Sequence, residues 1–137
     1  MMTKRLSPFI CAVCLLLLLA CSAAPSPDEA ALAAAKESVQ ASYEQLLAGH
    51  YDEFLEGRSG TSEMPERYRE QLRASCKQFM AQQESLHRGI RSFSVSDARI
   101  DSAQKLIQVF LILNYGDSTQ EEIVVPVVRQ DGAWKMK

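Results

Sequence analysis

The hydrophobic residues of this chain change their spacing at Gly89, and this change limits the possible folds more than any other feature. Before Gly89, apolar residues recur every three to four positions, and after it they recur at every second position. The first spacing is typical of amphipathic helices and the second of β-strands. Helices followed by strands, without alternation between them, predict a single α+β domain.

Three helices are expected before the change. The first begins at Ser26, which forms the sequence signature of a capping box with Glu29, and it ends at Gly49. A short helix is expected over residues 50–56, and a long one from about residue 62 or 64 to residue 88. The long helix has one largely apolar face, formed by Tyr68, Leu72, Cys76, Phe79, Gln83 and Leu86.

Four antiparallel strands are expected after the change, at about residues 91–100, 104–115, 119–130 and 133–137. The Asp131-Gly132 pair between the last two strands is the strongest hairpin signal in the chain. The N-terminal helices are therefore expected to pack on a four-stranded antiparallel sheet.

The second and third strands are apolar on both faces. In an antiparallel sheet with one face exposed to solvent, apolar and polar residues should alternate along each strand. Helices can cover only one face of so small a sheet, so a partner subunit or a ligand is expected on the other. Partial burial by loops and side-chain stems is the alternative. The expected dimer face consists of Leu106, Phe110, Ile112, Val124 and Val128. The spacing alone leaves open whether this row or the row from Ile107 to Leu113 faces the core.

The first 20 residues are typical of a secretory signal. Two basic residues precede an apolar run, Phe9 to Ala20, that is too short to span a bilayer. Leu18-Leu19-Ala20-Cys21 resembles the lipobox of bacterial lipoproteins, and this resemblance implies that Cys21 becomes the lipidated N-terminus. We therefore expect a tether over residues 21–26, a domain over residues 27–137, and a lipid anchor in the bacterial outer membrane, facing the periplasm.

The charge and the polar residues limit the partners. Removal of Lys4 and Arg5 with the signal leaves 13 of the 15 basic residues against 17 acidic ones, a net charge of about −4. An acidic domain is a poor ligand for nucleic acid, so none is expected. His50 and His87 lack a second ligand at helical spacing, and no phosphate-binding loop is present, so neither a metal nor a cofactor is expected. Cys76 is expected to be a small buried hydrophobic residue.

The order of helices, turns and strands resembles the small bacterial lipoproteins of the nuclear transport factor 2-like superfamily, which include domains of unknown function. The resemblance rests on the segments Gly49–Asp52, Gly89–Val95, Asn114–Asp117 and Asp131–Lys135. It implies a cone, in which a curved sheet wraps around the first helix and leaves a pocket between them. The superfamily includes isomerase-like and dehydratase-like enzymes as well as binding domains without catalysis, so this fold does not decide the function.

An isomerase-type site would need a carboxylate base and acidic hydrogen-bond donors in the pocket. The candidate pocket residues are Tyr43, Tyr68, Tyr115 and Trp134. Asp97 could accept a proton, but its position after Val95 on an apolar face is more simply explained by a β-bulge. We therefore expect a non-catalytic domain that binds a small apolar ligand or a protein partner, which could be a second copy. A cone-fold enzyme of isomerase or hydrolase type is the alternative.

Overall fold

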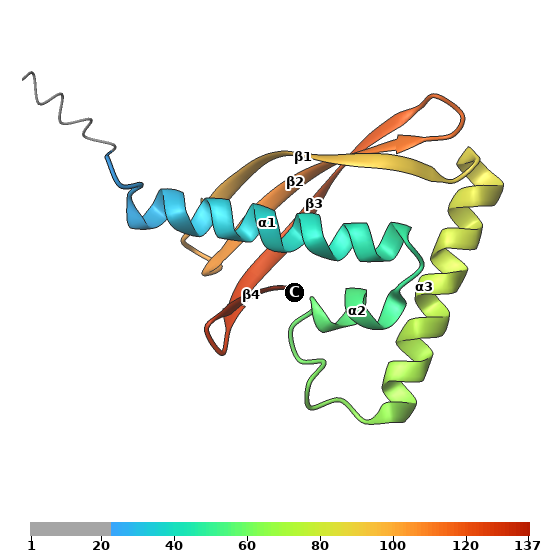
Figure 1. Cartoon of the computed structure of the whole chain (residues 1–137), viewed down its shortest axis with the longest axis horizontal. Coiled ribbons are helices and arrows are strands. Elements are labelled where there is room, and N and C mark those ends of the chain that lie inside the picture. Colours follow the sequence, from blue (N-terminus) through green and yellow to red (C-terminus); the bar gives the residue numbers. More distant parts are fainter. Residues whose placement is uncertain (1–22) are drawn as a thin grey trace, which may run out of the picture.

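The computed structural model describes residues 23–137, in which three helices precede four strands. These elements are α1 (Pro27–Leu47), α2 (Tyr51–Glu56), α3 (Glu66–His87), β1 (Ile90–Asp101), β2 (Leu106–Tyr115), β3 (Gln120–Gln130) and β4 (Ala133–Met136). The strands form one antiparallel sheet in the order β1-β2-β3-β4. The sheet is curved, α1 runs along one face of it, and α3 stands across its end (Figure 1). The expected α+β fold is therefore confirmed.

Local sequence signals explain how α1 begins and ends. The Ser26 hydroxyl accepts a hydrogen bond from the Glu29 backbone N–H, and the Glu29 carboxylate accepts one from the Ser26 N–H, both at 3.2 Å. This is the expected capping box. Just beyond the helix, Gly49 adopts a φ of +79°, which glycine reaches without strain. The buried face of α1 consists of Ala35, Val39, Ser42 and Leu46.

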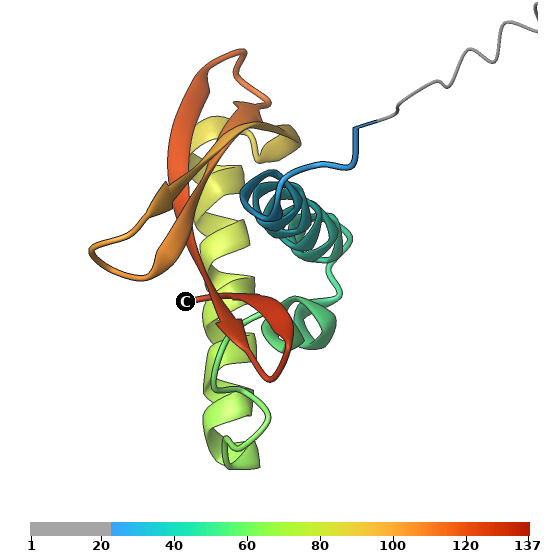
Figure 2. The same ribbon diagram turned by 90° about the vertical axis from the view of Figure 1, so that its left-hand side faces the viewer.

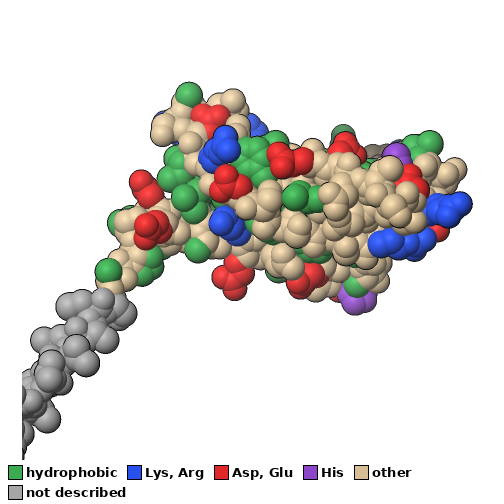
Figure 3. All heavy atoms as spheres, turned by 90° about the horizontal axis from the view of Figure 1, so that it is seen from above, with side chains coloured by type: hydrophobic (Ala, Val, Ile, Leu, Met, Phe, Trp, Pro, Cys, Tyr) green, Lys and Arg blue, Asp and Glu red, His purple; other side chains and the backbone are tan. Residues whose placement is uncertain are grey.

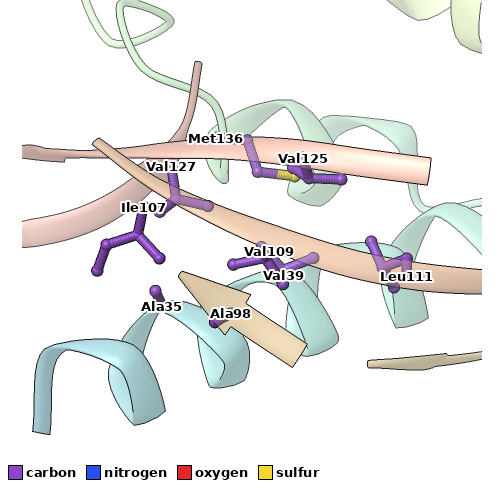
Figure 4. Packing of buried hydrophobic residues seen from close by; sticks show 9 residues of the cluster. All are labelled: Ala35, Val39, Ala98, Ile107, Val109, Leu111, Val125, Val127 and Met136. Atoms are coloured by element: carbon purple, nitrogen blue, oxygen red, sulfur yellow. The ribbon is translucent and has the colours of Figure 1, made fainter. Parts of the chain in front are cut away.

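The row of β2 that begins at Ile107 forms the core. Val109 and Leu111 are fully buried, and Ala35 and Val39 of α1 pack against this row (Figure 4). The sequence did not decide which row of β2 faces the core, and the structure shows that it is the row with Ile107. Leu106, which was expected on the dimer face, is only 5% exposed, and it lines a cavity together with Ile107 and Trp134. That part of the expectation is corrected.

The outer face of the sheet keeps a small apolar surface. Figure 2 shows α1 and α2 together on the inner side of the sheet, opposite this outer face. Phe110 lies opposite Val124 in the β2–β3 register, and Val124 is 49% exposed. The Arg99 guanidinium lies 5.1 Å from the centroid of the Phe110 ring and covers part of it. We call Phe110, Ile112, Val124 and Val128 the outer patch.

The helix α3 is much more exposed than its apolar face predicts. It begins at Glu66, after the N-cap residue Pro65, and none of its residues is fully buried. Leu86 is 70% exposed, and Cys76 is half-buried rather than buried. The helix stands across the end of the sheet (Figure 1) and has its main contacts with α2 and β1. Residues of its apolar face such as Tyr68 and Leu86 therefore remain largely exposed.

Replacing Gly57 by alanine should destabilise the domain. Gly57 has an ordinary φ of −73°, but a Cβ atom there would overlap the hydroxyl of Ser42, where α1 packs on α2. Overpacking of this kind costs about 1–3 kcal/mol of unfolding free energy, which a thermal melt would detect as a lower midpoint. The double variant Gly57→Ala, Ser42→Ala should regain much of this loss. Equal midpoints for the single and double variants would contradict the overlap.

Candidate functional site

Two adjoining cavities lie where α1 and α2 meet α3 and the end of the sheet. The first measures about 250 Å³ and is lined by residues of α1, α2 and α3, including Leu72 and Phe79. The second measures about 230 Å³ and is lined mainly by residues of β3 and β4. Tyr43, Phe54 and Arg58 line both cavities. We call the two cavities and these three shared residues the Arg58 site.

Two aromatic rings hold Tyr43 in place. The Tyr43 ring meets the Phe54 ring of α2 edge to face, with centroids 5.8 Å apart, and its centroid lies 5.7 Å from that of Phe93 in β1. Burial raises the pKa of Tyr43, although the nearby Arg58 charge opposes this shift. The phenol therefore stays protonated at neutral pH. Its hydroxyl makes no hydrogen bond to another described residue, so it can donate one to a ligand.

The wall formed by α3 is one helical stripe. Leu72, Ser75, Cys76 and Phe79 follow the i, i+3, i+4, i+7 spacing and line the first cavity together. Burial raises the pKa of the Cys76 thiol, and the Arg58 charge opposes this shift. Cys76 is therefore a neutral thiol at neutral pH rather than a reactive thiolate.

The backbone of Arg58 is fixed between α2 and β4. On one side of it, Met136 N–H donates a hydrogen bond to the Gly57 carbonyl at 2.8 Å, and on the other, Ser59 N–H donates to the Met136 carbonyl at 2.7 Å. The Thr61 hydroxyl donates to the carbonyl of Arg58 itself at 3.0 Å. These bonds fix the position of the Arg58 backbone, from which its half-buried side chain extends. Among the described residues, the Arg58 guanidinium forms no ion pair and no hydrogen bond.

The lining of the Arg58 site is mostly apolar, with a few polar groups. Its described lining contains one guanidinium, one phenol, one thiol and the Ser75 hydroxyl in a mostly apolar wall, with Lys137 at the rim, and it contains no Asp, Glu or His side chain. The carboxylate and imidazole side chains that often act as general bases are therefore not among these lining residues. Within residues 23–137, no group of three or more His, Cys, Asp and Glu residues could hold a metal ion.

Tyr115 lies away from the Arg58 site, where β2 ends. Its hydroxyl donates a 2.6 Å hydrogen bond to Glu121, and its ring stacks on His87 with centroids 4.4 Å apart. Burial and the bond to Glu121 raise the pKa of Tyr115 to about 12. His87 Nδ1 lies 3.2 Å from Asp117, whose pKa is lowered to about 2, mainly by hydrogen bonds from Thr119. These contacts tie the end of α3 to the β2–β3 turn.

The other two candidate pocket residues also lie elsewhere. Trp134 is half-buried and lines a cavity of about 320 Å³ near the start of α1, with the Arg129 guanidinium 5.5 Å from its ring centroid. Its carbonyl accepts a 2.7 Å hydrogen bond from Ser38 of α1. Tyr68 is 60% exposed on α3. Of the four candidates, the structure thus places only Tyr43 at the Arg58 site.

Sequence reasoning missed Phe54 and Arg58 as site residues. Phe54 has the spacing of an ordinary core residue of a short helix. Arg58 follows the glycine that ends α2, and nothing in its neighbours marks it as different from other surface arginines. The expected lipidation site Cys21, with the signal and the first part of the tether, lies outside the described residues.

The comparisons with known proteins establish the fold. No family model matches the chain, and no curated protein matches it significantly. A solved structure from Campylobacter jejuni, provisionally described as an NTF2-like transpeptidase, matches with a TM-score of 0.52 at 10% sequence identity. The match covers 81% of this chain and 97% of that one. The cone fold implied by the resemblance is therefore confirmed, whereas a likeness at this identity leaves the activity open.

Proposed function

We propose that this chain is a lipoprotein of the bacterial cell envelope whose NTF2-like domain binds a small apolar ligand at the Arg58 site and catalyses no reaction. The observation that supports binding is the pair of cavities that share Tyr43, Phe54 and Arg58. Ligand pockets commonly measure about 300–1,000 Å³ and combine apolar walls with a few polar groups. The two cavities together are of this size and composition, at the lower end.

The proposed anchor is a lipid on Cys21 in the outer membrane, on its periplasmic side. Its support is the Leu18–Cys21 segment at the end of an apolar run, six residues before α1 begins at Pro27. None of the helices that the structure describes is long and apolar enough to cross a bilayer. From above, acidic and basic side chains are interspersed, and hydrophobic ones gather near the start of α1 (Figure 3).

A second copy of the chain is the proposed protein partner. The outer patch is apolar and partly exposed, and two such patches related by a two-fold axis would form a self-complementary contact. Exposed apolar residues grouped on one face often mark an interface.

Binding is better supported than catalysis. An isomerase needs a positioned base, and an acyl-transfer enzyme of the kind named for the structural neighbour needs a nucleophile that a base activates. The nucleophile candidates on α3 at the Arg58 site are the Ser75 hydroxyl and the Cys76 thiol, whose pKa is raised by burial. No carboxylate or imidazole side chain lies with them among the described lining residues.

The neutral fluorescent probe N-phenyl-1-naphthylamine should bind the Arg58 site saturably, because its fluorescence rises when it leaves water for an apolar cavity. Cys76→Trp should fill the first cavity and weaken binding about tenfold or more. Ala74→Trp, on an exposed position of the same helix, is the matched control and should bind as the unaltered chain does. The absence of a saturable signal, or equal binding by the two variants, would contradict the proposed site.

A further inference from the structure

We propose that the ligand of the Arg58 site is an amphipathic carboxylate, with its head bound by Arg58 and Tyr43 and its apolar tail against α3. This inference rests on the proposed binding function and names the class of ligand. It follows from three features of the site: an arginine without a partner among the described residues, a second free donor beside it, and walls without acidic side chains.

Arg58 differs from the arginines that are paired on the surface. Arg73, for example, lies 2.8 Å from Asp52 and 3.5 Å from Glu66. Arg58 is half-buried, and none of the described residues offers it a carboxylate within 4.0 Å. A charge withdrawn from water is unfavourable unless it gains a partner. An anionic ligand would supply the partner that this chain does not.

The geometry favours a carboxylate over a simple monatomic anion. A guanidinium presents a planar fork of N–H donors that matches the two oxygens of a carboxylate. Tyr43 and Arg58 line both cavities, so a head group placed between them can accept hydrogen bonds from both side chains. The pKa of Tyr43 is raised by burial, so its phenol keeps the proton that it would donate.

The remaining walls fit an apolar tail. Leu72 and Phe79 of α3 and Phe54 of α2 line the first cavity, and Phe79 is 39% exposed, so part of its ring has no described neighbour. A tail in this cavity would bury apolar surface that is otherwise in contact with water. No Asp or Glu side chain lines either cavity, so no acidic side chain among the described lining residues repels an anionic head.

The test compares three probes of equal chain length: octanoate, 1-octanol and octylamine. Both hydrophobic clusters lie within residues 31–136, so residues 23–137 carry their own core. A cooperative thermal melt, recorded first, would confirm that this domain is folded. Each probe is titrated into the ¹⁵N-labelled domain, and amide shifts are followed at neutral pH. Octanoate should bind about tenfold or more tightly than octanol, as expected for a charge-assisted hydrogen bond, and octylamine most weakly. The largest shifts should occur at Tyr43, Arg58 and the middle of α3.

Arg58→Gln should remove the preference for octanoate over octanol. Arg73→Gln makes the same change of charge at a paired arginine away from the cavities, so it should keep the preference. Tyr43→Phe should reduce octanoate binding by a smaller factor. The probe comparison on the unaltered domain stays decisive even if a variant unfolds.

The two proposals fail differently in this experiment. Equal binding of octanoate and octanol would overturn the carboxylate assignment and leave the proposed binding site standing. Failure of octanoate, octanol and the neutral naphthylamine probe to bind would overturn both. Octanoate binding that persists unchanged in Arg58→Gln would place the head group elsewhere and would also overturn the inference.

Discussion

Replacing Phe110 by glutamate should turn a dimer of this domain into folded monomers, whereas the same change at its neighbour Leu111 should unfold it. Phe110 lies half-buried on the outer patch, opposite Val124, and Leu111 is fully buried against α1 on the inner face. An ionised carboxylate in the core, without a partner, costs several kcal/mol, which is comparable with the whole stability of about 5–15 kcal/mol of a typical domain. On the outer patch the carboxylate can remain in water, where it would oppose only an apolar interface.

Sedimentation equilibrium and thermal melting of residues 23–137 measure the two effects separately. The unaltered domain should be a dimer at high concentration, and Phe110→Glu should sediment as a monomer with a melting curve of normal shape. Leu111→Glu should show no cooperative melt. A strictly monomeric unaltered domain would refute the dimer, and the Arg99 guanidinium over Phe110 would then be part of what shields the outer patch. A stable Leu111→Glu would contradict the assignment of the inner face.

The elements were predictable because local signals define them. The capping box of Ser26 and Glu29, and the change of spacing at Gly89, depend only on residues close together in the chain. The β-bulge expected at Asp97 is present, as a register shift between Val95 and Asp97 in the β1–β2 pair. This shift lets both Val95 and Ala98 pack towards the core.

The assignment of faces was not predictable, because it is a tertiary property. Both rows of β2 are apolar, so only the position of α1 decides that Val109 is buried and Phe110 is not. The stripe of α3 likewise looks like a core face, but the helix stands across the end of the sheet and leaves Leu86 exposed. The Arg58 site joins residues from α1, α2, α3 and the last two strands, and the missing ion pair of Arg58 becomes visible only in three dimensions.

Replacing Cys21 by alanine should release the protein from the membrane. The thiol of Cys21 is the group that the lipobox resemblance identifies as the attachment point of the lipid. Each buried CH₂ of an acyl chain contributes about 0.8 kcal/mol to membrane binding, and two chains together give a stable anchor. Without the anchor, the domain keeps a net charge of about −4, which does not favour an anionic bilayer surface. We therefore expect a nearly complete shift from the membrane pellet to the soluble fraction.

Growth of a bacterial host with labelled palmitate tests the anchor independently of fractionation. The unaltered protein should carry the label, and Cys21→Ala should not. Ser22→Ala is the matched control, because it alters the neighbouring position and keeps the thiol, so it should remain labelled and in the pellet. A Cys21→Ala variant that stays in the pellet and still carries label would show that lipid is attached at another residue. That outcome would overturn the proposed anchor. A variant that stays in the pellet without label would locate the lipid at Cys21 but contradict the expectation that the lipid alone holds the protein at the membrane.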